Sequence, residues 1–571
     1  MPHIIADNII SPLGDTSLSN YLAVKAGQTA LRTHHSAEIG IKEDFVASML
    51  TEEQSDALRG GDAGLSRFEA KVTASVTKAV AQAAKQTPID ITAADVVLIL
   101  STTKGNVESL GDSTDHALMG ESAARIAARL GMTTMPVVAC NACISGVSAI
   151  LLADRLLRLG IYNHAVVCGT DDIGRFVVSG FQSLKAMSPQ QCRPFDMERM
   201  GLNLGEAVAT MILSNHGTSG TWQVVNGAVR NDAFHISAPS KKAEGQYLCL
   251  SHVLSDFDKQ RLAFANLHGT ATLFNDQMES VAMERAGLSA VPANSLKGFF
   301  GHTLGAAGIL ETIISMKAAD DHTVLATRGF AELGVSGKVN LLPSNAVATQ
   351  SGFVKTISGF GGCNAAIVID KAADDTPHTA PAANLTATHR VTITPSGATA
   401  DGAAIASDVP ADQLITQLYK HHIGDYPKYY KMDKLCRLGF VAAELLLKAE
   451  GAQRFVERDD RAVVLFNSQS SIHADKAYFA SIAHSDDFYP SPSLFVYTLP
   501  NIVTGEIAIR NLLHGETAFY VMPRRDDGMI HKIFKATACD TATRSIVGGW
   551  LEYVDDGNFT ADLTIYEIQK K

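Results

Sequence analysis

The 571-residue sequence contains no run of ~18 uninterrupted apolar residues, the length that a membrane-spanning helix needs. Its N-terminal segment, MPHIIADNIISPLGD, lacks the basic region, apolar run and small-residue cleavage site of a secretion signal. Cysteines are few: of the eight, only Cys140 and Cys143 lie close together, and none follows the spacing of a disulfide framework. These absences predict a soluble, cytoplasmic protein in a reducing compartment.

Positive charge is also in short supply, with 48 lysines and arginines against 59 acidic residues and a net charge of −11. That balance argues against bulk binding of nucleic acid, although a local basic patch can still serve an acidic partner. Charged residues make up 19% of the chain and apolar residues 46%, which excludes a disordered or fibrous protein. The length allows about four domain-sized units at ~150 residues each.

Short apolar runs alternate with helical patterns along most of the chain. Residues 96–100, 136–140 and 165–168 are predicted strands, and the segment between the last two has apolar residues at helical spacing and Gly160 as a stop signal. Strand–helix–strand units of this kind indicate an α/β fold with largely parallel, buried sheets.

Two breaks in composition divide the chain. Residues 371–388 are rich in Asp, Pro, Ala and Thr without apolar periodicity, which predicts a linker before a C-terminal part of roughly 185 residues. A second break at 215–220 (NHGTSG) divides the larger N-terminal part into two halves.

A cysteine stands where a predicted strand ends and a helix begins, in residues 138–146 (VACNACISG). The helix dipole and unpaired backbone N–H groups there favour a thiolate, and small neighbours leave room for a substrate. A buried structural cysteine is the alternative. A redox or metal-binding pair of Cys140 and Cys143 is another, but Cys140 is expected to point into the sheet and no second cysteine pair completes a zinc site.

Two histidines and a lysine lie in small-residue turns at predicted strand ends. The first turn is HGTAT at 268–272 with Asn275 and Asp276 after it, the second is KGFFGHTLGAAG at 297–308, and a glycine-rich turn, GFGGCNA, follows at 359–365. Active sites in α/β folds gather on such turns.

These motifs occur in the order found in the elongating β-ketoacyl-[acyl carrier protein] synthases of the thiolase superfamily, which residues 1–370 resemble. The resemblance also rests on Pro12-Leu13-Gly14, RPFD at 193–196 and the segment 201–206. It implies a thiolase-like α/β fold, in which two βαβαβαββ halves (1–215 and 216–370) form an αβαβα sandwich.

The resemblance also implies roles for single residues. Cys143 carries the acyl chain, His268 and His302 assist decarboxylation of malonyl-carrier protein, and Lys297 pairs with Glu311. Asp276 and Phe360 are expected as supporting residues, Phe360 in the gating turn. Thr270, Thr272 and Gly361 are expected to contact substrate. No metal and no resident cofactor are expected, because phosphopantetheine arrives on the acyl carrier protein partner.

The C-terminal part, 389–571, repeats the pattern of the first half without its catalytic motifs. The segments 430–450, 461–468 and 493–513 are similar in pattern to 66–84, 95–102 and the stretch around the cysteine, and placing Gly505 on Gly146 sets Ile502 opposite Cys143. An unrelated small α/β domain is the alternative. The repeat resembles a degenerate half-sized chain-length factor, as accompanies ketosynthases of aryl-polyene-type pathways.

Three functions follow from these readings. The leading one is decarboxylative condensation in polyene or polyketide synthesis, with housekeeping fatty-acid elongation as its alternative. A non-catalytic scaffold is disfavoured by the complete set of catalytic residues, and an acyltransferase on coenzyme A thioesters is disfavoured by the two histidines. We further expect a homodimer, or a pseudo-dimer within one chain in which the C-terminal part takes the place of a second subunit.

Overall fold

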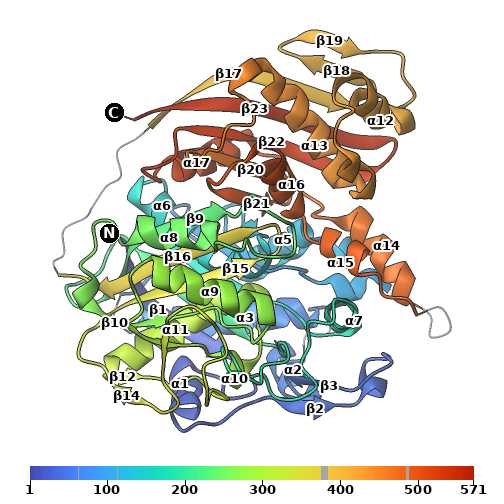
Figure 1. Cartoon of the computed structure of the whole chain (residues 1–571). Helices are drawn as coiled ribbons and strands as arrows, with labels where there is room; N and C mark the ends of the chain where they lie inside the picture. Colours follow the sequence, from blue (N-terminus) through green and yellow to red (C-terminus); the bar gives the residue numbers. More distant parts are fainter. Residues whose placement is uncertain (62–63, 86, 112–113, 374–382, 484–487, 571) are drawn as a thin grey trace.

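A continuous β-sheet joins distant parts of the chain in the computed structural model, which describes residues 1–61, 64–85, 87–111, 114–373, 383–483 and 488–570 (Figure 1). Its N-terminal part has the order β1-β8-β6-β4-β5; β4 lies parallel to β5 and β6, and β8 runs antiparallel to β1 and β6. The strands are β1 (His3–Ile10), β4 (Val96–Ser101), β5 (Val137–Ala139), β6 (His164–Thr170) and β8 (Val208–Ser214). The predicted strands at 96–100, 136–140 and 165–168 are therefore present.

A second sheet is built from residues 222–371. Its order is β9-β16-β15-β10-β11-β13, and β9 also pairs with the start of β1, which ties the two sheets together. The strands are β9 (Trp222–Asn231), β10 (Leu262–Asn266), β11 (Pro292–Asn294), β13 (Asn340–Leu341), β15 (Gly352–Gly359) and β16 (Cys363–Lys371).

Helices cover both sheets and fill the space between them. Helix α3 (Arg67–Ala83) packs on β1, β6 and β8, whereas α8 (Glu244–Val253), which also contacts α9 (Leu273–Arg285), packs on β9 and β16. Between the sheets lie α6 (Ser145–Arg158) and α11 (Ala307–Asp320), which contact each other. The αβαβα sandwich expected from the sequence is confirmed.

The two central helices approach each other at glycines. A methyl group on Gly146 would lie 2.9 Å from the amide nitrogen of Ile309, and one on Gly308 would lie 2.6 Å from that of Val147. Only glycine permits such a close backbone approach. The N-termini of α6 and α11 are thereby brought together, and the cysteine turn meets the His302 turn there.

The C-terminal part repeats the strand order of the first sheet. Its strands follow β21-β20-β22-β23-β17, with β20 parallel to β21 and β22, and β23 antiparallel to β22 and β17. They are β17 (Ala383–Thr394), β20 (Arg461–Asn467), β21 (Thr517–Val521), β22 (Ser545–Asp555) and β23 (Asn558–Lys570). Outward from β21 this is the arrangement β5-β4-β6-β8-β1.

The two parts join through β5 and β21, which pair antiparallel at Ala139–Tyr520 and Val138–Val521. Helix α17 (Asp527–Thr537) packs against α6 across this junction. Two buried ion pairs cross it as well: Arg155 with Glu516 at 2.8 Å and Arg230 with Asp540 at 2.6 Å. In Figure 1 the orange and red C-terminal elements accordingly stack directly on the rest of the molecule.

The register predicted for the C-terminal repeat is wrong. Because β21 occupies the place of β5, the counterpart of the cysteine turn lies between β21 and α17, at 522–526, and not at Ile502. Ile502 begins α16 (Ile502–Asn511), which packs on α13 (Lys434–Leu447) as α5 (Met119–Arg129) packs on α3. Ile502 is therefore matched with a position in α5.

The predicted linker is too long at its C-terminal end. Residues 383–388 belong to β17, which pairs with β23 from Ala383 onward, while 374–382 lie outside the described residues. Residues 383–388 thus belong to the C-terminal part. The expected division at 215/216 falls in the turn between β8 and β9. Among the described residues, no helix is both long and apolar enough to cross a bilayer.

Candidate active site

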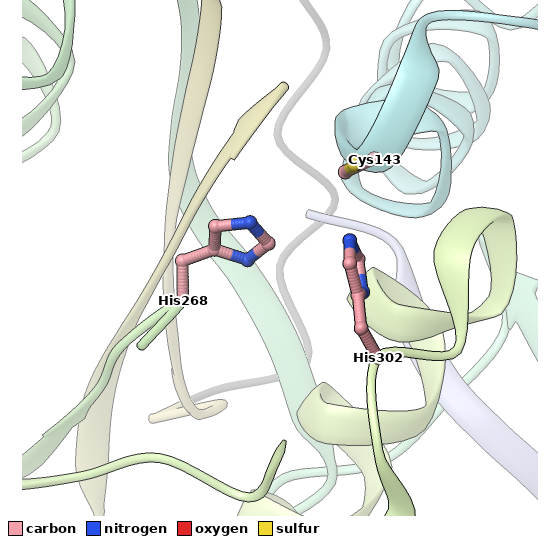
Figure 2. Close-up of side chains that lie close together, drawn as sticks. All are labelled: Cys143, His268 and His302. Carbon is pink, nitrogen blue, oxygen red and sulfur yellow. The ribbon is translucent and has the colours of Figure 1, made fainter. Parts of the chain in front are cut away.

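Cys143, His268 and His302 converge at one point, as Figure 2 shows. Cys143 lies in the 3-10 turn η3 (Ala142–Ile144) before α6, His268 follows β10, and His302 follows α10 (Lys297–Phe300). The sulfur of Cys143 and one ring nitrogen of each histidine all lie within 4.8 Å of one another, and the imidazole rings meet edge to face at 5.1 Å. The three residues assigned by the resemblance are thus brought together.

The cysteine turn is held by residues from both ends of the chain. Ala142 has φ of +48°, and the Ser145 hydroxyl accepts from the Asn141 N–H and donates to the Ala142 carbonyl. From β21, the Phe519 N–H donates to Asn141 Oδ1 at 2.6 Å, and the Phe519 carbonyl accepts from the Cys140 N–H at 3.0 Å. The C-terminal part therefore fixes the two residues before the strained position.

Burial raises the pKa of the Cys143 thiol to about 12, although the nearby Lys297 ammonium opposes the change. Burial thus opposes the thiolate that the backbone N–H groups of the turn favour. Desolvation of the charged sulfur outweighs the dipole. A proton acceptor has to take the thiol proton when the sulfur reacts.

The two histidines are neutral hydrogen-bonding groups with open nitrogens. Burial, followed by the positive charge of Lys297, places the pKa of each well below its ordinary value. Among the described residues, neither ring nitrogen of His302 nor Nδ1 of His268 has a hydrogen-bond partner. Buried polar atoms are rarely left unpaired, so these nitrogens mark a place where a ligand binds.

A carboxylate on α9 positions His268. Glu279 accepts hydrogen bonds from the backbone N–H of His268 at 2.7 Å and from that of Gly269 at 2.8 Å. The turn is also fixed through Asp276, which accepts from the N–H groups of Ala271 and Phe195. Burial raises the pKa of Asp276 to about 7. Asp276 thus supports the turn rather than lining the cavity.

Lys297 pairs with Glu311 as the resemblance implies, and a second lysine joins them. Glu311 Oε1 accepts from Lys297, and Glu311 Oε2 lies 2.5 Å from Nζ of Lys355, a fully buried residue of β15. Two cations on one carboxylate leave one net positive charge near both histidines. Lys355 was not predicted; its place in the apolar strand before the glycine-rich turn is a signal in the sequence, but it does not show the ion pair with Glu311.

An open cavity of about 410 Å³ leads to Cys143 and both histidines. Thr270 and Thr272, whose hydroxyl groups lie 2.9 Å apart, line it together with Phe360. Gly361 does not belong to this lining: its N–H donates to the Ile236 carbonyl, and a methyl group on it would lie 2.7 Å from Nδ2 of Asn501. Of the expected substrate contacts, the two threonines therefore face the cavity.

A smaller inner cavity lies behind Cys143, with about 20 Å³ of space, enough for one water molecule. Cys143, Phe181 and Phe360 line both cavities, and the rings of Phe181 and Phe360 stack at 6.4 Å. Phe495 and Leu499 from the C-terminal part close the inner cavity. The two phenylalanines thus stand between the outer opening and a pocket that both parts of the chain build.

The Cys143, His268 and His302 ligand atoms are also the type that zinc prefers. Ligands of tetrahedral zinc at 2.0–2.3 Å lie roughly 3.3–3.8 Å from one another, closer than the 4.8 Å span found here. The unpaired nitrogens facing a substrate-sized cavity favour an organic substrate over a structural metal ion.

Comparison with known proteins agrees with this site. Residues 44–218 match the family described as beta-ketoacyl synthase, N-terminal domain, and residues 223–331 match its C-terminal domain. The chain is 33% identical over 249 residues to 3-oxoacyl-[acyl-carrier-protein] synthase 2 of Rhizobium meliloti, covering 40% of this chain and 59% of that protein. It is 31% identical over 255 residues to the tetracenomycin polyketide synthase ketoacyl synthase alpha subunit of Streptomyces glaucescens, covering 41% and 59%.

Solved structures extend the likeness of fold to the whole chain. The ketosynthase ApeO in complex with its chain length factor ApeC, from Xenorhabdus doucetiae, aligns over 65% of this chain and 98% of that one, with a TM-score of 0.55 and 22% identity. The PfaC keto synthase–chain length factor aligns over 99% of this chain and 78% of that one, with a TM-score of 0.77 and 14% identity.

The curated relatives are matched over only about three-fifths of their own length. Both family domains are nevertheless present in sequence, in order and on a shared thiolase-like fold. Residues 44–218 and 223–331 of this chain are thus similar to the two domains of the β-ketoacyl synthase family.

Proposed function

We propose that the protein catalyses decarboxylative Claisen condensation of an acyl group on Cys143 with malonyl-acyl carrier protein. Cys143 meets two neutral histidines in an open cavity, and each histidine has a ring nitrogen without a partner among the described residues; this arrangement carries the proposal. No resident cofactor is required, because phosphopantetheine arrives on the carrier protein.

In the first step the Cys143 sulfur attacks the carbonyl carbon of an acyl thioester. The thiol gives up its proton, the new carbon–sulfur bond forms, and the pantetheine sulfur leaves with a proton as the free thiol. A histidine ring nitrogen with no partner is suited to take up the proton, which the high pKa of Cys143 makes necessary. The small-residue turn around Cys143 leaves space for the tetrahedral intermediate.

In the second step malonyl-carrier protein enters through the outer cavity. The carboxylate leaves as carbon dioxide and its electron pair forms an enolate, which attacks the acyl carbon and releases the Cys143 sulfur. The product is 3-oxoacyl-carrier protein. N–H groups of His268 and His302 would stabilise the enolate oxygen, and the net positive charge of the Lys297–Glu311–Lys355 group would favour this developing negative charge.

The proposal is tested by following both half-reactions separately. Incubation with acyl-carrier protein should give a thioester adduct on Cys143, visible by mass spectrometry, and addition of malonyl-carrier protein should convert it to 3-oxoacyl-carrier protein. A scaffold would form no adduct. Rapid loss of carbon dioxide from malonyl-carrier protein should depend on His268 and His302. An acyltransferase on coenzyme A thioesters would not catalyse this decarboxylation.

We propose further that the C-terminal part takes the place that a second ketosynthase subunit occupies in a dimer. Its strand order, the β5–β21 pairing and the α6–α17 contact support this, since all three relate the two parts by an approximate twofold axis. Sedimentation measures the mass in solution. The mass of one chain agrees with a pseudo-dimer within that chain, whereas the mass of two chains agrees with exchange of C-terminal parts between chains.

We place the reaction in polyene or polyketide synthesis of the aryl-polyene type, in the cytoplasm, with housekeeping fatty-acid elongation as the alternative. Similar solved structures pair a ketosynthase with a chain length factor, among them the ishigamide ketosynthase/chain length factor, and support this context. Turnover of a panel of alkyl and aryl-acyl primers distinguishes the two, because an elongation enzyme prefers saturated alkyl groups.

A further inference from the structure

Lys104 places an amine deep in the protein beside the candidate nucleophile. The residue follows β4, is 5% exposed, and lines the inner cavity together with Cys143, Phe181 and Leu499. Its Nζ donates to the backbone carbonyl and to the hydroxyl of Thr498 in the C-terminal part. It also lies 5.1 Å from the ring centre of Phe495 and 5.6 Å from that of Phe176.

This amine is not fully satisfied by the protein. An ammonium group has three N–H donors, and among the described residues only the two oxygens of Thr498 accept from it. No described carboxylate lies within ion-pair distance; Asp475, the first of the acids that act on it, is itself buried and bonded to Ser471. Burial lowers the pKa of Lys104 only to about 8, so it carries a proton at neutral pH.

A second polar group without a partner lies against the same two rings. Tyr478 is fully buried, its ring meets Phe176 at 4.8 Å and Phe495 at 5.3 Å, and its hydroxyl has no partner among the described residues. Tyr478 itself does not line the inner cavity, whereas Lys104 does, and an acyl pocket meant for a plain alkyl chain gains nothing from the Lys104 ammonium. Burial of an ammonium without a counter-ion or a third acceptor is costly, so the site is incomplete until a ligand supplies one.

The hydrogen bonds from Lys104 to Thr498 connect the first half to the C-terminal part, but this role does not explain why the donor is a charged ammonium. A neutral amide side chain can donate to the same two oxygens without the cost of burying an ion. The cation becomes useful where an oxygen atom reaches it from the cavity, because hydrogen bonds to a charged donor are about twice as strong as neutral ones.

We infer that the inner cavity accepts an acyl group that carries an oxygen function away from its thioester, and that Lys104 binds this oxygen. The oxygen belongs to a hydroxyl, a carbonyl or a carboxylate, all of which accept hydrogen bonds. The inference rests on the proposed function, since it assumes that Cys143 carries an acyl group. Phe181, Phe360 or Phe495 has to move to admit the chain, because the cavity otherwise holds a single water molecule.

The test measures acylation of Cys143 in the full-length protein by mass spectrometry, without malonyl-carrier protein. The probes are carrier proteins loaded with the alkyl series from butanoyl to octanoyl and with the ω-hydroxy and ω-carboxy members of the same lengths. At its best length, the wild type should load an oxygenated group about 10-fold or more faster than the alkyl group, and Lys104→Met should bring this ratio close to one. If Lys104→Met removes the rate advantage of the ω-carboxy groups but not that of the ω-hydroxy groups, the bound substrate is an anion.

Two further variants separate recognition from structure. Thr498→Val removes one acceptor of the amine but keeps its charge, and should retain the preference. Tyr478→Phe, which removes a buried hydroxyl outside the cavity lining, should also retain the preference. Lys104→Gln replaces Lys104→Met if the methionine variant does not fold. A wild type without preference, or a folded Lys104 variant that keeps it, overturns the inference. Absence of any adduct on Cys143 overturns the proposed function instead.

Discussion

The first half of the chain and its C-terminal part have the same strand order, but only one has a nucleophile turn. After β5 the chain runs through Asn141, Ala142 and Cys143 in a tight turn before α6. After β21 it runs through Pro523, Arg524 and Arg525 before α17. Bulky, charged residues replace the small ones, so the scaffold persists where the chemistry is absent.

The two sheets also differ in what covers their inner faces. A methyl group on Gly169 of β6 would lie 3.0 Å from the Gly305 carbonyl, so the second half packs tightly on the first sheet. On the C-terminal sheet the corresponding region beside α17 is a surface pocket, bordered by Arg525 and Arg390, which both pair with Asp562. Polar side chains thus border this face of the C-terminal sheet. We therefore expect the chemistry to depend mainly on residues 1–370, and the C-terminal part to support their structure.

The largest effect is expected when a cysteine in each part is replaced by alanine and the two variants are compared. Cys143→Ala should abolish condensation and leave the fold intact, because alanine fits a small-residue turn. Cys539→Ala, at a partly exposed cysteine of the C-terminal part, should leave turnover unchanged. Both are measured as 3-oxoacyl product formed, with circular dichroism as a check on folding. Condensation by the alanine variant at 143 would contradict the assignment of the nucleophile.

The support given by the C-terminal part is tested at the buried pair of Arg230 with Asp540, whose side chains are 3% and 0% exposed. Asp540→Asn leaves a buried cation without its counter-ion and should lower the free energy of unfolding by about 3–5 kcal/mol. Asp527→Asn, which removes an exposed pair with Arg525, should cost under ~1 kcal/mol. Denaturant unfolding compares them.

The same pair has a defined acid dependence. Burial alone raises the pKa of Asp540, but Arg230 and Arg155 lower it well below its ordinary range. A depressed folded-state pKa contributes stability above the unfolded pKa, near 4, and this contribution disappears as pH falls through the folded value. The difference between wild type and Asp540→Asn should therefore shrink below pH ~4; an unchanged difference would contradict the ion-pair account.

Removal of either histidine should slow decarboxylation of malonyl-carrier protein by ~10²–10³-fold, the usual effect of losing one positioned donor to a developing oxyanion. His268→Ala and His302→Ala should each retain acylation of Cys143 by mass spectrometry, because the remaining histidine still offers a ring nitrogen for the thiol proton. His531→Ala, at an exposed histidine of α17, is the control in the C-terminal part. Normal carbon dioxide release in both active-site variants would show that these turns have another role.

A smaller effect, about 10-fold in kcat/KM, is expected for Lys355→Met, because one positive charge is removed while the Lys297–Glu311 pair remains. Burial first, and then the lysines, lower the pKa of both histidines. Loss of Lys355 should raise these pKa values, so protonation would inhibit at a higher pH. The acid limb of the pH–rate profile should therefore move upward; an unchanged limb would show that Lys355 has no electrostatic role.

The catalytic residues could be predicted from the sequence because each lies in a short turn of small residues at a strand end. Lys355 could not, since its ion pair depends on Glu311 of a distant helix. The burial that raises the pKa of Cys143 is likewise a property of the assembled layers. The C-terminal repeat was predicted, but its alignment with the first half was wrong. Gly505 and Gly146 both lie in helices that follow apolar segments, so their local patterns are similar. The correct match depends on strand order, which a local sequence pattern does not show.

The pairing of β5 with β21 has a consequence for how the protein behaves at low concentration. An exposed edge of a central sheet is a template for unwanted strand addition. Here the covering strand is tethered to the strand it covers, so its local concentration is set by chain geometry and not by expression level. Dilution cannot uncover the edge or release the Phe519 hydrogen bonds that hold the cysteine turn. Specific activity should then stay constant on dilution, and each chain should contribute one independent reaction centre.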